Sequence, residues 1–103
     1  MAGAVINAEA QIGDLAIINT GAGIDHETIL GVACHIGPGA AIAGGVRIGS
    51  CALLGVGSSV APGRMVGDGA IIGAGACVIH DINPHVTAVG VPAIAVASPR
   101  MKR

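Results

Sequence analysis

The chain contains 103 residues, enough for one domain, and it lacks Phe, Tyr and Trp altogether. Its five basic and six acidic residues give a net charge of -1, which argues against a nucleic-acid-binding surface. No apolar stretch reaches the length of a membrane span, and the first residues lack the features of a secretory signal, so we expect a cytoplasmic protein. An interior without aromatic rings must be filled by small and branched aliphatic side chains.

A six-residue repeat runs through most of the chain. Each hexad begins with Ile, Leu or Val, and the residue that follows is usually small or short and polar. The fifth position of the hexad is also small in most repeats. The aliphatic positions are Ile6, Ile12, Ile18, Ile24, Leu30, Ile36, Ile42, Ile48, Leu54, Val60, Val66, Ile72 and Val78.

A period of six matches neither an α-helix nor an ordinary strand. It matches a short strand followed by a turn, so that three hexads close one triangular coil of 18 residues. We therefore predict an all-β fold, a single parallel β-helix over residues 1–80 with about four coils and a height of roughly 20 Å. The aliphatic residues and the small fifth-position residues would point inward, and glycines would form the turns.

Two departures from the repeat predict changes in this prism. Arg64 occupies a fifth position, where a buried guanidinium would be costly, so we expect a distortion over residues 62–66 that carries Arg64 to solvent. After Val78 the phase fails, because Pro84 and Gly90 stand at aliphatic positions. We predict that residues 81–103 form a C-terminal cap and a basic, solvated tail.

Several motifs occur at fixed offsets. They are INTGAGIDHE at 18–27, CHIGPGA at 34–40 and AGG at 43–45, and the last repeats read GAGACVIHDINPHV at 73–86 and VGVPA at 89–93. Together they resemble the hexapeptide-repeat acyltransferases, and within these the sialic-acid O-acetyltransferase and nucleotide-amino-sugar N-acetyltransferase group. The resemblance covers about residues 3–93. Serine acetyltransferases are less similar, because their characteristic loop insertion is absent.

The resemblance implies a left-handed β-helix that assembles as a homotrimer with active sites in the clefts between prisms. It also implies acetyl-CoA as co-substrate, no metal, and acetylation of sugars for surface glycans. Members of this group usually carry an N-terminal domain that binds the nucleotide sugar, whereas here the repeats start close to Met1. The chain is either a stand-alone member or the β-helix part of a longer protein.

Acetyl transfer to an amine or hydroxyl needs a base, a donor for the developing oxyanion and a surface that aligns the pantetheine arm. His26 is the candidate base, because it occupies the outward third position of its hexad and lies between Asp25 and Glu27. Either carboxylate could orient its ring. The resemblance places the catalytic histidine at His26 and its orienting acid at Glu27.

The remaining candidates are assigned by resemblance and by spacing. The resemblance gives His35 a contact with acetyl-CoA, the Gly44 N–H a contact with the thioester oxygen, and backbone positions such as Val56 and Ala74 contacts with the pantetheine arm. Gly44 lies 18 residues after His26, one coil along the same column, whereas His35 lies half a coil away. His26 and His35 therefore share a site only if another protomer supplies one of them.

Asn19 and Thr20 are candidate contacts for the sugar substrate, although Asn19 could instead form an amide ladder between coils. We expect His80 and His85 to be structural or incidental. The histidine spacing does not match the zinc site of γ-carbonic anhydrases, which use the same prism. Cys34, Cys51 and Cys77 have no zinc or disulfide spacing, so we expect reduced thiols.

Three functions remain open. The first is acetyl-CoA-dependent N-acetylation of an amino sugar, expected to be nucleotide-linked, with His26 as general base. The second is O-acetylation of sialic acid or a related sugar, which would use the same base. The third is a non-catalytic trimeric β-helix domain that lacks its sugar-binding partner domain.

Overall fold

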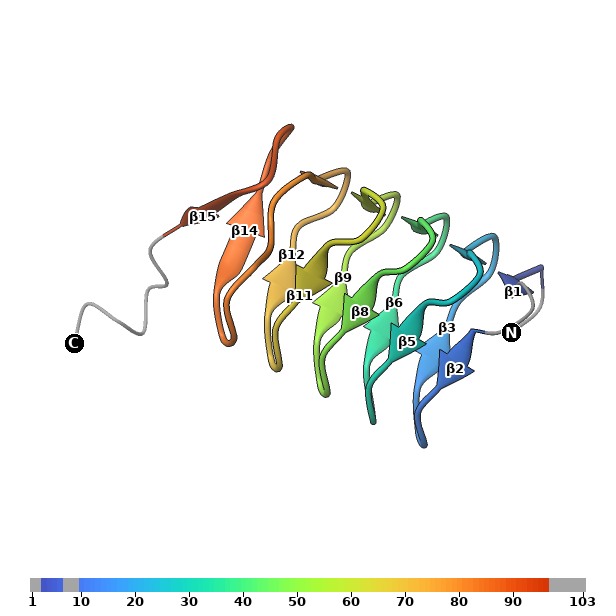
Figure 1. Ribbon diagram of the computed structural model, residues 1–103. Helices are drawn as coiled ribbons and strands as arrows, with labels where there is room; N and C mark the ends of the chain where they lie inside the picture. Colours follow the sequence, from blue (N-terminus) through green and yellow to red (C-terminus); the bar gives the residue numbers. More distant parts are fainter. Residues whose placement is uncertain (1–2, 7–9, 97–103) are drawn as a thin grey trace.

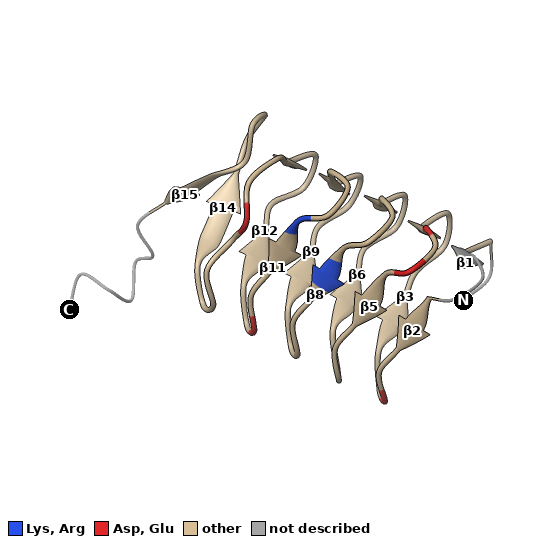
Figure 2. Ribbon diagram, viewed as in Figure 1, with Lys and Arg blue, Asp and Glu red and all other residues tan. Residues whose placement is uncertain are grey.

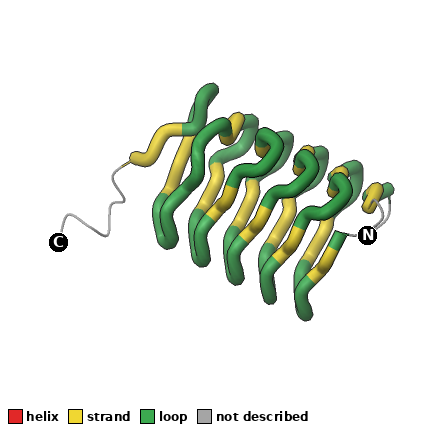
Figure 3. The backbone as a smooth tube through the Cα atoms, in the orientation of Figure 1, coloured by secondary structure: helices red, strands yellow, loops and turns green. Residues whose placement is uncertain are grey.

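The computed structural model describes residues 3–6 and 10–96 of the chain. Fifteen short strands follow one another without a helix in this part (Figures 1 and 3). The basic tail expected at residues 99–103 lies outside the described residues. The strands are β1 (Val5–Ile6), β2 (Gln11–Ile12), β3 (Ile17–Ile18), β4 (Gly23–Ile24), β5 (Ile29–Leu30), β6 (His35–Ile36), β7 (Ala41–Ile42), β8 (Arg47–Ile48), β9 (Leu53–Leu54), β10 (Ser59–Val60), β11 (Met65–Val66), β12 (Ile71–Ile72), β13 (Cys77–Val78), β14 (Thr87–Val89) and β15 (Ile94–Val96).

From β1 to β13 every third strand pairs in parallel, so the chain winds into a three-sided β-helix (Figure 1). Sheet A contains β1, β4, β7, β10 and β13; sheet B contains β2, β5, β8 and β11; sheet C contains β3, β6, β9, β12, β14 and β15. In sheet A, Ile24 pairs with Ile42 and Val60 with Val78, a step of 18 residues. The predicted all-β fold and its 18-residue coil are thus confirmed.

The aliphatic residue that opens each hexad fills the axis of the prism. From Ile18 to Val78 these side chains are all at most 2% exposed, whereas Ile12 in the first coil is 38% exposed. From Ala22 onward the small fifth-position residues are also buried, and the hydroxyl of Thr28 among them donates to the carbonyl oxygen of Ala43 at 2.9 Å. Because the interior of the prism is narrow, aliphatic and small side chains fill it without aromatic rings.

Arg64 does not disturb the coil, so the predicted distortion over residues 62–66 is wrong. The next strand keeps its register, with Met65 opposite Arg47 and Val66 opposite Ile48. Arg64 itself is half-buried. The long stem of an arginine can bring its guanidinium to solvent from such a position without moving the backbone.

The parallel ladder continues beyond residue 80. Val66 forms a parallel bridge with Ile82, and Ile72 pairs with Ala88, a step of 16 residues in place of 18. The last coil is therefore two residues shorter, which is why the hexad phase fails in the sequence. The element that leaves the coil is β15, which pairs antiparallel with β14.

The turns bring successive coils so close that some positions accept only glycine. A Cβ atom on Gly31 would lie 2.5 Å from the backbone nitrogen of Ser50, whereas a Cβ atom on Gly23 would meet nothing within 4 Å.

Gly31→Ala is expected to lower the free energy of unfolding by about 1–3 kcal/mol, because the backbone of the neighbouring coil must shift. Gly23→Ala, the matched control, should change it by less than about 1 kcal/mol. Chemical denaturation measures both, and equal stabilities would contradict this account of the turns.

Candidate functional site

The candidate site lies at the corner where sheet A turns into sheet B, which we call the AB corner; the CA corner, in the same way, joins sheet C to sheet A. The chain leaves β4 at Ile24, places Asp25, His26 and Glu27 in the turn, and returns inward at the buried Thr28. Glu27 takes a left-handed backbone conformation with φ 57°. The turn is fixed to the next coil by the amide of Gly45, which donates to the carbonyl oxygen of His26 at 3.1 Å.

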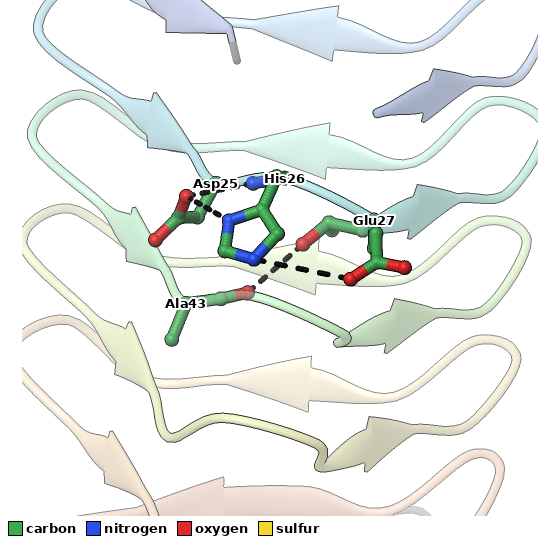
Figure 4. A network of polar contacts seen from close by, with 5 residues as sticks. Asp25, His26, Glu27 and Ala43 are labelled. Carbon is green, nitrogen blue, oxygen red and sulfur yellow. Dashed lines mark hydrogen bonds and ion pairs between the residues drawn. The ribbon is translucent and has the colours of Figure 1, made fainter. Parts of the chain in front are cut away.

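The imidazole of His26 lies between two carboxylates (Figure 4). Its Nδ1 is 2.8 Å from Oδ1 of Asp25, and the same oxygen accepts the backbone N–H of His26 at 2.7 Å. Its Nε2 is 3.9 Å from Oε1 of Glu27. The side chains are 59% exposed for His26, 45% for Asp25 and 68% for Glu27. The ring is therefore held at the surface, where a substrate can reach it.

Gly44 lies directly beside the ring in the next coil. A Cβ atom on Gly44 would be 3.2 Å from Cε1 of His26, closer than nearly all real Cβ contacts. The N–H of Gly44 takes part in no hydrogen bond within the described part of the chain. The predicted pairing of His26 with Gly44 along one column is thus present, and it leaves a backbone donor beside the imidazole.

Hollows lie on both sides of this corner. A groove of about 430 Å³ runs over sheet A, along the outward residues Gly23, Ala41, Ser59 and Cys77, with Asp25 at its edge. On sheet B, a hollow of about 460 Å³ is lined by Ala10, Gln11, Glu27 and Ile29. The groove over sheet A was not predicted from the sequence. Small outward residues recur on this face every 18 positions. The six-residue repeat alone does not distinguish this face of the prism from the other two.

The other predicted site residues lie elsewhere on the same chain. Thr20, Val56 and Ala74 form the corner between sheets C and A, where the coils stack through the amide of Gly75, which donates to the carbonyl oxygen of Val56 at 2.8 Å. His35 lies on the outer face of sheet C, in β6. The candidate residues therefore form two groups: His26, Glu27 and Gly44 at the AB corner, and Asn19, Thr20, His35, Val56 and Ala74 at or beside the CA corner.

Asn19 and His35 contact each other within the second group. The Asn19 amide nitrogen lies 2.8 Å from Nε2 of His35 and donates to the carbonyl oxygen of Ile36 at 3.1 Å. The bond to Ile36 joins two coils, but it is not an amide ladder, because the next positions of this column are Gly37 and Gly55. The separation of His35 from His26 agrees with the expectation from their nine-residue spacing.

Charged side chains are sparse on the prism (Figure 2). Within residues 3–6 and 10–96, the cations are Arg47 and Arg64, which lie on adjacent coils of sheet B. His80 follows sheet A at the same corner as His26, and His85 lies at the corner between sheets B and C. The part that the structure describes contains no group of three metal-ligating side chains and no helix able to cross a membrane.

The thiols are distributed over different environments. All three cysteines are unpaired: Cys34 is buried in the core, Cys51 is exposed and Cys77 is partly buried in the sheet A groove. Burial raises the pKa of the Cys34 thiol above its ordinary value. The core position of Cys34 agrees with the prediction of a small packing residue there.

The chain resembles solved acetyltransferase structures. It is 53% identical to a mutant of perosamine N-acetyltransferase from Caulobacter crescentus in complex with CoA and GDP-perosamine, with a TM-score of 0.94 over 95% of this chain and 47% of that one. It is 28% identical to the acetyltransferase domain of PglB from Neisseria gonorrhoeae in complex with acetyl coenzyme A, with a TM-score of 0.79 over 91% of this chain and 55% of that one.

A serine acetyltransferase from Neisseria gonorrhoeae is 30% identical, with a TM-score of 0.86 over 92% of this chain and 41% of that one. The chain thus spans about half the length of the structures that it matches. No protein-family model and no curated protein sequence matches it.

The chain belongs to the hexapeptide-repeat acetyltransferases and has their left-handed parallel β-helix. Its similarity to perosamine N-acetyltransferase confirms the resemblance to nucleotide-amino-sugar N-acetyltransferases that the sequence motifs indicated.

Proposed function

We propose that the chain catalyses, or is the catalytic domain that catalyses, transfer of an acetyl group from acetyl-CoA to the amine of a nucleotide-linked amino sugar. The observation that carries this proposal is the surface imidazole of His26, which is bonded through Nδ1 and flanked by a backbone donor at Gly44. The complex of perosamine N-acetyltransferase with CoA and GDP-perosamine supports the class of acceptor. We propose that the product serves surface-glycan synthesis and that the setting is the cytoplasm.

In the proposed reaction, the amine nitrogen attacks the thioester carbonyl carbon while Nε2 of His26 accepts a proton from that nitrogen. Negative charge develops on the carbonyl oxygen, where the N–H of Gly44 can donate to it. The C–S bond then breaks, and the leaving sulfur takes the proton back from Nε2 of the His26 imidazolium, so that the products are the N-acetyl sugar and free CoA thiol and His26 is neutral again. Glu27, on the Nε2 side of the ring, would stabilise the imidazolium.

We also propose that the chain works as a homotrimer in which each site uses two protomers. The two groups of candidate residues lie on different corners of one prism, so a cleft between prisms would bring the AB corner of one against the CA corner of its neighbour. In that cleft, His35, Val56 and Ala74 would hold acetyl-CoA, and Asn19 and Thr20 would contact the sugar.

The outer face of sheet C supports this assembly. Ile17, His35, Leu53 and Ile71 follow one another along it. The three aliphatic side chains in this row, Ile17, Leu53 and Ile71, have exposed fractions of 52%, 40% and 40%. Exposed aliphatic side chains gathered on one face in this way mark surfaces that partners cover.

Release of free CoA thiol tests the proposal. The chain is mixed with acetyl-CoA and a GDP- or UDP-linked amino sugar, and thiol is measured against a reaction without the sugar. Acceptor-dependent release is expected, with an N-acetylated product seen by mass spectrometry. Release with sialic acid alone would favour O-acetylation. No release with any sugar, together with no acetyl-CoA binding by calorimetry, would leave a non-catalytic module.

A further inference from the structure

The two carboxylates beside His26 face different ring nitrogens. Asp25 lies 2.8 Å from Nδ1, within hydrogen-bond distance, whereas Glu27 lies 3.9 Å from Nε2, beyond it. Figure 4 shows the ring between them, with Asp25 on one side and Glu27 on the other. The two acids are therefore not equivalent, although both are sequence neighbours of the same histidine.

Asp25 is itself held in place by the turn. Its Oδ1 accepts the backbone N–H of His26 at 2.7 Å, so the same oxygen receives two bonds from one residue. The backbone bond fixes the carboxylate in front of Nδ1 whatever the state of the ring. Glu27 has no comparable anchor: its side chain is 68% exposed and extends toward the hollow on sheet B.

This geometry determines which nitrogen is basic. An ionised carboxylate accepts hydrogen bonds and does not donate them, so a neutral ring bonded to Asp25 carries its proton on Nδ1. The lone pair then lies on Nε2, which is the nitrogen that points away from Asp25. A free imidazole favours the tautomer with its proton on Nε2. The bond to Asp25 therefore reverses this preference and leaves Nε2 free to act as a base.

We propose that Asp25 is the positioning residue of His26: it holds the proton on Nδ1 and leaves Nε2 as the basic nitrogen, whereas Glu27 does not set the tautomer. The role of the Nε2 lone pair in acetyl transfer rests on the proposed function, but the tautomer itself does not. Glu27 lies on the side from which the acceptor amine would approach, where a carboxylate attracts a protonated amine and stabilises the imidazolium.

Ring nitrogen NMR of the uniformly ¹⁵N-labelled chain tests the tautomer without any substrate. The His26 signals are assigned by their loss in His26→Gln. We expect neutral His26 in the wild-type chain to be mainly the Nδ1–H tautomer, Asp25→Ala to shift it toward Nε2–H, and the matched control Glu27→Gln to leave it unchanged. A wild-type ring that is mainly Nε2–H overturns the proposal even if Asp25→Ala fails to fold. So does a tautomer that changes in Glu27→Gln and not in Asp25→Ala.

Kinetics then separate positioning from general damage. Asp25→Ala is expected to lower kcat about 10²-fold, the lower end of the range that a general base contributes, with little change in the KM for acetyl-CoA, because the ring remains but Nε2 more often carries the proton. Asp25→Asn retains an oxygen acceptor and should recover part of the loss. Equal loss in both variants, with the three other histidine signals unchanged, would overturn the proposal. If the chain shows no acetyl transfer at all, the NMR result still decides the tautomer, so the two failures are distinguishable.

Discussion

Replacing His26 with alanine is expected to lower kcat/KM for acetyl transfer by about 10²- to 10⁴-fold, the range that a general base contributes. The imidazole is exposed, bonded to Asp25 and adjacent to the Gly44 backbone, so in the proposed reaction it would meet the reacting atoms while adding little to the packing of the prism. The melting temperature and acetyl-CoA affinity should therefore stay close to wild type. Thiol release and calorimetry measure the two effects separately.

The matched control is His80→Ala. His80 is also an exposed histidine at the AB corner, three coils further along the prism, and it has no assigned role. Its replacement should leave activity unchanged. Full activity in His26→Ala would remove His26 from the mechanism, and an equal loss in both variants would point to a general effect on the corner.

Mixing two inactive variants is expected to restore activity. His26→Ala damages the AB corner, and His35→Ala damages the face of sheet C beside the CA corner, so each homotrimer would contain three impaired clefts. In randomly mixed trimers from equal amounts of both chains, about one cleft in four combines an intact AB corner with an intact neighbouring face. Activity should reach about a quarter of the wild-type value, measured as thiol release after co-expression with two affinity tags.

Each variant alone gives the baseline, and sedimentation gives the assembly state. A stable monomer of 9.9 kDa would contradict the shared site directly. Mixed trimers without any gain in activity would show that His26 and His35 do not act in the same cleft.

Much of the fold could be predicted from the sequence because the repeat is regular. Ile24, Ile42 and Val60 stand at the same phase, and the ladder pairs them as the 18-residue coil requires. The prediction was wrong at Arg64, because a hexad position gives the direction of a side chain but not how far its stem can reach. The last coil, which is shortened by two residues before Ile82, could not be predicted either, because the sequence shows only that the repeat loses its phase there.

The candidate site was less predictable. Spacing correctly placed Gly44 beside His26 and separated His35 from both, because whole and half coils are simple multiples of the repeat. It did not distinguish Asp25 from Glu27. Both flank His26 in the sequence, and only the backbone of the turn, with Glu27 at φ 57°, decides which carboxylate faces Nδ1.

The sequence by itself determined the three-sided prism, the direction of its aliphatic residues and the columns that its corners form. These follow from local periodicity, because each hexad repeats the same strand and turn and the coils stack in register. Only the tertiary structure decided which oxygen meets which ring nitrogen and which face is hollowed. Those features depend on turn dihedral angles and on side chains from successive coils, which a count along the chain does not contain.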